Sequence, residues 1–249
     1  MSSDKGAAAL RRTRAADRGS ALASLSEGLA HALRNPLTGI SSGVEFLGRQ
    51  MARDPVQQEN VAAVLHEVRR LNGLLEDLVR ITHPPRLDLR PVALEAALQE
   101  LAREAATRFP EVRLEARCEP RVGRPRLDAS QVRGALRELL SNAAQAAPPG
   151  STVSLSAALE PPGAEQADLG DPLLRVDVVD RGPGVPPPVR QARFEPFRTT
   201  RPGAKGLGLY IAHDIAARHG GELRLADEAG GGTRATLYLP WEIGDDDGD

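Results

Sequence analysis

The sequence has few aromatic residues, one cysteine and no long apolar run. Aromatic residues make up 3% of the 249 positions, so Leu, Val and Ala must supply any core. The single cysteine, Cys118, excludes an internal disulfide and fits a reducing compartment. A net charge of -2 gives no general attraction to nucleic acid or to an anionic membrane surface. No apolar stretch approaches the roughly 20 residues that span a bilayer, and none follows the N-terminal arginines as in a secretory signal. We therefore expect a soluble, cytoplasmic protein with no membrane span and no nucleic-acid partner.

Two helical patterns occupy the N-terminal third. Apolar residues recur every three or four positions over residues 22–51, which is the period of a helix. Asp54 and Pro55 interrupt this pattern, and a strict three-four alternation typical of a coiled-coil seam follows over residues 61–78. We predict a polar, disordered tail over 1–18 and an antiparallel helical hairpin over 19–83. Since one hairpin cannot bury both stripes, we infer a homodimer in which two hairpins form a four-helix bundle.

The pattern becomes mixed after a Pro-containing linker at residues 83–85. Helices are expected over 94–108, from a cap at Asp128 to 147, and over 208–219; strands are expected over 112–116, 153–159, 173–179, 222–225 and 234–239. This order predicts an α+β fold whose C-terminal domain, 88–243, is an α/β sandwich with helices on one face of a mixed sheet. Residues 244–249 are expected to form a solvated acidic tail.

His31 lies off the apolar stripe, nearly opposite Leu29, and is therefore expected to face solvent. A single exposed histidine does not by itself indicate a function, and the other four histidines are interpreted as having no functional role. Pro36 distinguishes this position, because a proline inside a helix costs about 3 kcal/mol and is tolerated where a helix bends or moves.

Glu138 and Asn142 lie one turn apart on the same face of a predicted helix. Mg²⁺ takes oxygen ligands and retains several waters, so one or two protein oxygens suffice. Either residue is therefore a candidate metal ligand, and Glu138 is alternatively a residue that orients water. A solvent-facing or capping pair is the other interpretation.

Asp180 ends an apolar strand and is followed by Gly182 and Gly184. A carboxylate there can accept a hydrogen bond from the exocyclic amine of adenine, while glycines let the backbone approach a flat ring. An ordinary strand-exit turn is the alternative, because Asp and Gly are common in turns.

Gly206 and Gly208 precede an apolar helix. Backbone N–H groups at a helix N-terminus attract phosphate. Arg201 and Lys205 lie just before this start and can contact phosphate oxygens. A charged surface loop is the alternative interpretation.

In this order the segments resemble the transmitter core of two-component sensor histidine kinases, over about residues 20–240. The most similar subgroup is the nitrogen-regulation type, whose H box also reads Asn-Pro-Leu. The corresponding segments are the H box at 31–37, the N box at 138–146, the G1 box at 180–184, the F box at 194–200 and the G2 box at 203–209. The resemblance implies a dimeric phosphotransfer hairpin followed by an ATP-binding domain of the histidine kinase/GHKL type.

The resemblance also implies residue roles and partners. His31 would accept phosphate from ATP, Asn142 and Glu138 would hold Mg²⁺, and Asp180 would contact the adenine amine. The same match implies that Asn35 orients water when the partner is dephosphorylated. It also implies ATP contacts for a further set of residues: Gly182, Gly184, Arg201, Lys205, Gly206, Leu207, Gly208 and Thr233. The phosphoryl group would pass to an aspartate on the receiver domain of a response regulator. A separate sensor protein is a further candidate partner.

The sequence departs from the family pattern at four places: Ala32 follows His31 where an acid is usual, Glu138 replaces an asparagine, Gln145 replaces a cation, and Ala204-Lys205 replaces a small-Gly-Thr approach. Losing a positioned base costs roughly 10²–10⁴-fold in rate. We hypothesise that Glu27, one turn before His31, replaces it, since helical side chains lean toward the N-terminus; a plain surface acid is the alternative. Other interpretations of the chain are a degenerate kinase that scaffolds a receiver, a phosphatase that uses Asn35, and an ATPase in which Glu138 activates water.

Overall fold

The chain folds into two compact units, Met1–Arg86 and Leu87–Asp249. A computed structural model describes residues 33–50, 55–160, 172–185, 187, 194–197, 199 and 205–242. Both predicted tails lie outside these residues, and the domain limits 19–83 and 88–243 stay predictions. Among the described helices, none combines the length and apolar character needed to cross a membrane.

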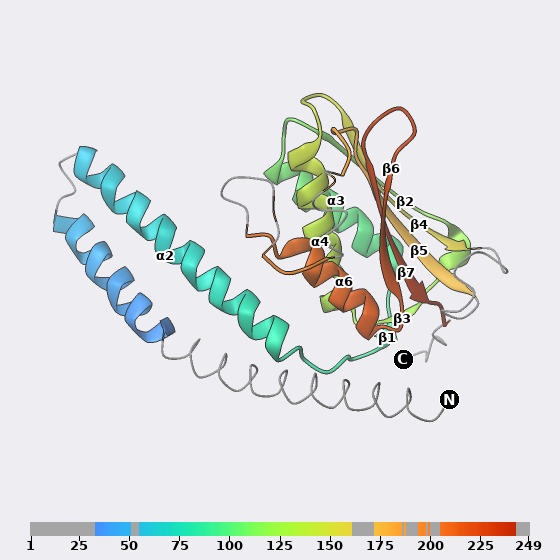
Figure 1. Cartoon of the computed structure of the whole chain (residues 1–249), viewed down its shortest axis with the longest axis horizontal. Helices are drawn as coiled ribbons and strands as arrows, with labels where there is room; N and C mark the ends of the chain where they lie inside the picture. Colours follow the sequence, from blue (N-terminus) through green and yellow to red (C-terminus); the bar gives the residue numbers. More distant parts are fainter. Residues whose placement is uncertain are drawn as a thin grey trace, which may run out of the picture. The chain divides into compact units, whose positions relative to one another are not determined.

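The described residues of the first unit form a helical hairpin, as the sequence predicts. A helix over residues 33–50 lies beside α2 (Pro55–Thr82), and the two run in opposite directions (Figure 1). Pro55 opens α2, where its missing N–H costs no helical hydrogen bond. The two helices touch at Gly48, where an added Cβ would lie 2.8 Å from Cγ1 of Val61. The side-chain amide of Gln58 also donates to the carbonyl oxygen of Gly48 at 2.6 Å.

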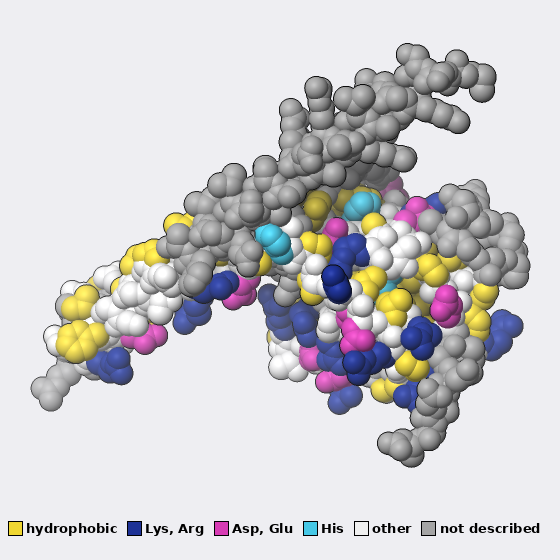
Figure 2. All heavy atoms as spheres, turned by 90° about the horizontal axis from the view of Figure 1, so that it is seen from below, with side chains coloured by type: hydrophobic (Ala, Val, Ile, Leu, Met, Phe, Trp, Pro, Cys, Tyr) yellow, Lys and Arg dark blue, Asp and Glu magenta, His cyan; other side chains and the backbone are white. Residues whose placement is uncertain are grey.

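Exposed apolar side chains form two rows on the hairpin, each with a spacing of seven residues. The first row is Leu33, Ile40 and Leu47, and the second is Val64 and Leu71. These five side chains are 39–48% exposed, and apolar atoms lie along the hairpin surface in Figure 2. The apolar residues predicted as one seam in the second helix therefore have two environments. Val68 is buried inside the hairpin, whereas Val64 and Leu71 of the second row are exposed.

A five-stranded sheet organises the second unit, in the order β2-β4-β5-β7-β6. Its strands are β2 (Arg113–Cys118), β4 (Thr152–Glu160), β5 (Leu173–Val179), β6 (Glu222–Asp227) and β7 (Thr233–Pro240). Strand β2 pairs in parallel with β4, and the other neighbours are antiparallel. The predicted mixed sheet is thus confirmed. A small sheet of β1 (Arg90–Pro91) and β3 (Arg126–Leu127), and a 3₁₀ turn η1 (Pro120–Val122), were not predicted, because two or three residues carry no readable period.

Helices α3 (Leu94–Arg108), α4 (Ala129–Ala146) and α6 (Gly208–Arg218) cover one face of this sheet (Figure 1). Alternation along the strands directs apolar side chains toward them. On β5 these are Leu174, Val176 and Val178, which pair with Leu239, Leu237 and Ala235 of β7 and are all buried. The alternate positions of β5, including Arg175 and Asp177, belong to the opposite face.

The predicted cap of α4 is confirmed. Asp128 Oδ1 accepts from the backbone N–H groups of Ser130 and Gln131, both at 3.1 Å, and Asp128 is 6% exposed. Burial alone would raise the pKa of this carboxyl, but hydrogen bonds from the backbone of Asp88 and Gln131 and from the side chains of Ser130 and Gln131 outweigh it and lower the pKa to about 2. The cap therefore fixes the start of the helix that carries Glu138 and Asn142.

Candidate functional site

Asp180 follows β5 directly and is held by the first residue of β7. Its Oδ1 accepts from the backbone N–H of Gly182 at 2.7 Å and from that of Thr233 at 3.2 Å. The backbone N–H of Asp180 donates to the carbonyl oxygen of Thr233 at 2.9 Å. Although Asp180 is only 5% exposed, its Oδ2 has no hydrogen-bond partner among the described residues. The carboxylate is therefore fixed through one oxygen, and the other can accept from a ligand.

The turn after Asp180 lies against the end of α4. A Cβ added to Gly182 would lie 2.6 Å from the carbonyl oxygen of Ala146 and 2.9 Å from Oδ1 of Asp180. Only glycine fits this approach without moving the backbone. Gly184 lies on the same turn, and its added Cβ would approach Oδ1 of Asp227 at 3.2 Å.

The start of α6 lies against the middle of α4. A Cβ added to Gly208 would lie 2.6 Å from Oε2 of Glu138 and 3.4 Å from Nδ2 of Asn142. Both α4 side chains are half-buried, and the start of α6 lies close to them. Leu207, which precedes the helix, is 1% exposed and anchors its start.

One face of α4 therefore connects the predicted residues. Glu138, Asn142 and Ala146 follow each other at intervals of four residues, which places them one above the other on a helix. Ala146 meets the Asp180 turn, and Glu138 meets the start of α6. The two ends of this row are roughly 12 Å apart along the helix, from a rise of about 1.5 Å per residue.

The structure brings together Asp180, Gly182, Gly184, Glu138, Asn142, Gly208 and Thr233 through these contacts. Lys205 and Gly206 lie directly before α6 and are half-buried. Arg201, Glu27 and His31 lie outside the described residues. Asn35 is exposed on the helix over residues 33–50, in the first unit.

Oxygen atoms at the Glu138 end suit a magnesium ion bound together with phosphates. In the described part of the chain, no group of three or more His, Cys, Asp or Glu side chains is arranged to hold a metal. Mg²⁺ does not need one, because it is commonly held by one or two protein oxygens and substrate phosphates. The carboxylate of Glu138 and the amide oxygen of Asn142 are the oxygen donors of this row.

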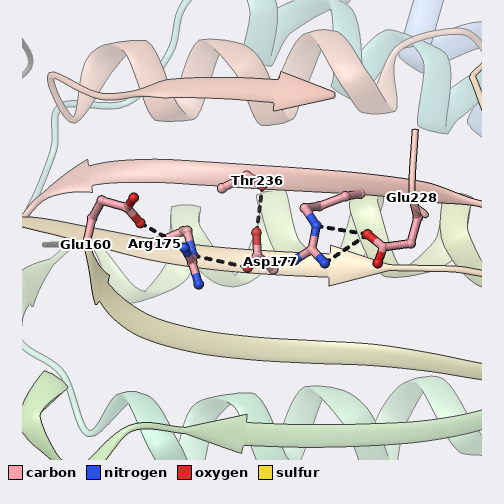
Figure 3. Close-up of polar contacts among 6 residues, drawn as sticks. Glu160, Arg175, Asp177, Glu228 and Thr236 are labelled. Atoms are coloured by element: carbon pink, nitrogen blue, oxygen red, sulfur yellow. Dashed lines mark hydrogen bonds and ion pairs between the residues drawn. The ribbon is translucent and has the colours of Figure 1, made fainter. Parts of the chain in front are cut away.

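Sequence reasoning missed the ion pairs around Asp177, which Figure 3 shows on the outer face of the sheet. It also missed the contact of His219 with Asp128, whose backbone N–H donates to Nε2 of His219 at 3.2 Å. The one sequence signal for the ion pairs was the presence of a carboxylate, Asp177, within the apolar run of β5. No local pattern marks the contact of His219 with Asp128, because the partners are 91 positions apart.

Comparisons with known protein families cover both units. Residues 21–84 match the His Kinase A (phospho-acceptor) domain, and residues 127–243 match the histidine kinase-, DNA gyrase B- and HSP90-like ATPase family. Among curated relatives, the histidine-protein kinase AtoS of Escherichia coli K12 is 28% identical over 92% of this chain and 36% of its own length. The sensory histidine kinase/phosphatase NtrB of Salmonella typhimurium is 28% identical over 87% of this chain and 61% of its own length. The chain therefore spans less than two thirds of these relatives.

Two solved structures are also similar to this chain over most of its length. The full-length structure of ShkA in complex with AMPPNP matches 88% of this chain and 46% of that chain, with a TM-score of 0.73 and 25% identity. The mycobacterial sensor histidine kinase MprB matches 63% of this chain and 99% of that chain, with a TM-score of 0.51 and 28% identity.

Proposed function

The chain belongs to the two-component histidine kinases as a transmitter core, and on that premise we propose that it binds ATP in the second unit, phosphorylates itself on His31 and passes the phosphoryl group to a response-regulator aspartate. The observation that carries the nucleotide site is the row on α4, which joins the Asp180 turn at one end to the start of α6 at the other. A nucleotide needs one region that contacts its base and another that contacts its phosphates, and the two ends of the row would supply them.

The adenine end is the Asp180 turn. Oδ2 of Asp180 would accept from the exocyclic amine of adenine, since Oδ1 is already held by Gly182 and Thr233. Gly184 lies on the same turn, close to Asp227 and Gly232, and would let the backbone approach a flat ring there.

The phosphate end is the region of Glu138, Asn142 and the start of α6. Lys205 and the N-terminal backbone N–H groups of α6 would attract phosphate oxygens, and Arg201 is proposed to contribute a forked contact. Glu138 and Asn142 would hold Mg²⁺, which when bound neutralises negative charge on the phosphates.

His31 is the proposed nucleophile. A neutral ring nitrogen attacks the γ-phosphorus, the bond to the β-phosphate oxygen breaks, and ADP leaves with that electron pair. With a reference pKa of about 6.5, an exposed imidazole is mostly neutral at pH 7 to 8. Glu27 is proposed to take the ring proton in place of the acid missing at Ala32. Positioning and charge neutralisation do most of the catalytic work in this class of reaction.

The two exposed rows on the hairpin support a homodimer. Apolar residues at a spacing of seven form a packing seam, and a single hairpin leaves both rows uncovered. We propose that two copies cover them in a four-helix bundle. A cytoplasmic location, a receiver-domain partner and a separate sensor protein belong to the same proposal; the single cysteine fits that compartment.

Phosphatase activity toward the receiver is a second candidate function. Asn35 is exposed and stands four residues after His31 in the sequence, and one relative is itself described as a kinase/phosphatase. A side-chain amide in that place can orient a water molecule for attack on an acyl phosphate.

Calorimetric titration with ADP and Mg²⁺ tests the nucleotide site. We expect the chain to bind ADP, Asp180→Asn to weaken this binding strongly, and Asn142→Ala to make it less dependent on Mg²⁺. Arg137→Gln is the control, because Arg137 lies on the same helix, is exposed and pairs with Glu104 of α3. Absence of nucleotide binding, or binding that Asp180→Asn leaves unchanged, would contradict the proposal.

A further inference from the structure

A buried carboxylate, Asp177, lies at the centre of the outer sheet face. Its side chain is 4% exposed. Oδ1 accepts from the hydroxyl of Thr236 at 2.6 Å, and Oδ2 lies 3.2 Å from both Nη1 of Arg234 and Nε of Arg175 (Figure 3). A carboxylate removed from water in this way requires such partners, because burying an isolated charge is costly.

Arg234 binds a second carboxylate with the rest of its guanidinium. Nε and Nη2 lie 3.0 Å and 2.8 Å from Oε2 of Glu228, whose side chain is 17% exposed. Glu228 begins the turn between β6 and β7, and this turn closes on itself: the backbone N–H of Glu228 donates to the carbonyl oxygen of Gly232 at 3.1 Å. The planar guanidinium of Arg234 thus ties the turn to β5, a geometry that an ammonium group cannot reproduce.

Gly232 and Thr233, which join this turn to β7, both lie against Asp180. Thr233, the neighbour of Arg234, donates its backbone N–H to Oδ1 of Asp180. Gly232 packs so closely that an added Cβ would lie 2.0 Å from the carbonyl oxygen of Asp180. Any shift of the turn therefore moves a donor that fixes this carboxylate.

We propose that Arg234, through Asp177 and Glu228, is a positioning residue for base selection at Asp180. It keeps the turn over residues 228–232 in place, so that Thr233 occupies Oδ1 and Oδ2 is left for the amine of adenine. This inference rests on the proposed nucleotide site. It assigns selectivity for adenine to an ion-paired arginine that does not itself touch the nucleotide.

Arg175 provides a matched control. It also pairs with Asp177, but its other partner is Glu160, 2.9 Å away at the far end of β4, and not the turn. Replacing either arginine with methionine leaves Asp177 one cationic partner and keeps most of the side-chain volume. The two variants therefore differ in whether the turn is held.

The experiment compares binding of ATP and of inosine triphosphate, which lacks the exocyclic amine, to the full chain with Mg²⁺. We expect the wild type to bind ATP more tightly than inosine triphosphate. In Arg234→Met the ratio of the two dissociation constants should fall roughly tenfold, which is equivalent to weakening one charged hydrogen bond. Arg175→Met should keep the preference, and Arg234→Lys should retain part of it. Reduced folding alone would weaken both nucleotides equally and leave their ratio unchanged.

The possible outcomes distinguish the adenine contact from the positioning role. If the wild type shows no preference, or Asp180→Asn keeps it, the proposed adenine contact is wrong. If Asp180→Asn removes the preference while Arg234→Met retains it, only the positioning role is overturned. The positioning role is also overturned if Arg175→Met loses as much preference as Arg234→Met. Should Arg234→Met fail to melt cooperatively, Glu228→Gln tests the same connection, since it weakens the ion pair on the turn side alone.

Discussion

Gly208 at the start of α6 faces Glu138 on α4, and an added Cβ would lie 2.6 Å from the Oε2 atom of that glutamate. The nearest obstacle is the end of a flexible side chain, so the fold can accommodate Gly208→Ala by moving the carboxylate. We therefore expect a melting temperature close to that of the wild type together with weaker Mg²⁺-dependent ADP binding, measured by calorimetry. Unchanged binding would mean that the carboxylate position does not matter.

Gly232 should behave in the opposite way. Its φ is +116°, and its added Cβ would lie 2.0 Å from a backbone oxygen, which cannot move aside like a side chain. Gly232→Ala should lower the free energy of unfolding by about 3 kcal/mol or more, from backbone strain and overpacking together. Gly231→Ala is the control, because that position also has positive φ but nothing lies within 4 Å; we expect a cost of about 1 to 2 kcal/mol from strain alone. Urea denaturation measures both, and equal losses would refute the close contact.

Asp128 should make stability sensitive to acid. Because folding lowers its pKa from 3.8 to about 2, its contribution is complete above pH 4 and is lost as the pH falls through about 2. Asn is also a good helix cap, so Asp128→Asn should fold, be less stable at neutral pH, and lose less stability between pH 4 and pH 2. Melting temperatures across this range test the prediction. Curves that stay parallel down to pH 2 would show that Asp128 is not the responsible group.

The exposed rows on the hairpin predict the oligomeric state. Leu71→Glu places a charge in the second row, whereas Ala62→Glu places the same charge at an exposed position of α2 on the side opposite Val64 and Leu71. If the rows form the dimer seam, light scattering should report a dimer for the wild type and for Ala62→Glu, and a monomer for Leu71→Glu. A Leu71→Glu dimer would require another interface.

Several parts of this arrangement were predictable because they depend on local patterns. The strand over residues 173–179, the helix over 94–108 and the cap at Asp128 follow from alternation, helical period and capping chemistry, and the structure confirms them. The meeting of Gly208 with Glu138 was not predictable from spacing, since it depends on how α6 packs on α4. Arg234 was missed for a related reason. Its partners are 57 and 6 positions away and meet only through the pairing of β5, β6 and β7.

Phosphate transfer to His31 is the central claim, and labelling with ATP that carries a radioactive γ-phosphate tests it most directly. With Mg²⁺ present, the full chain should acquire a label that acid removes and base does not, as expected for a phosphorylated imidazole. His31→Gln should abolish this label, while His66→Gln, which changes an exposed histidine on α2, should retain it. A chain that binds ATP yet takes up no label, or a His31→Gln variant that is labelled like the wild type, would contradict the account.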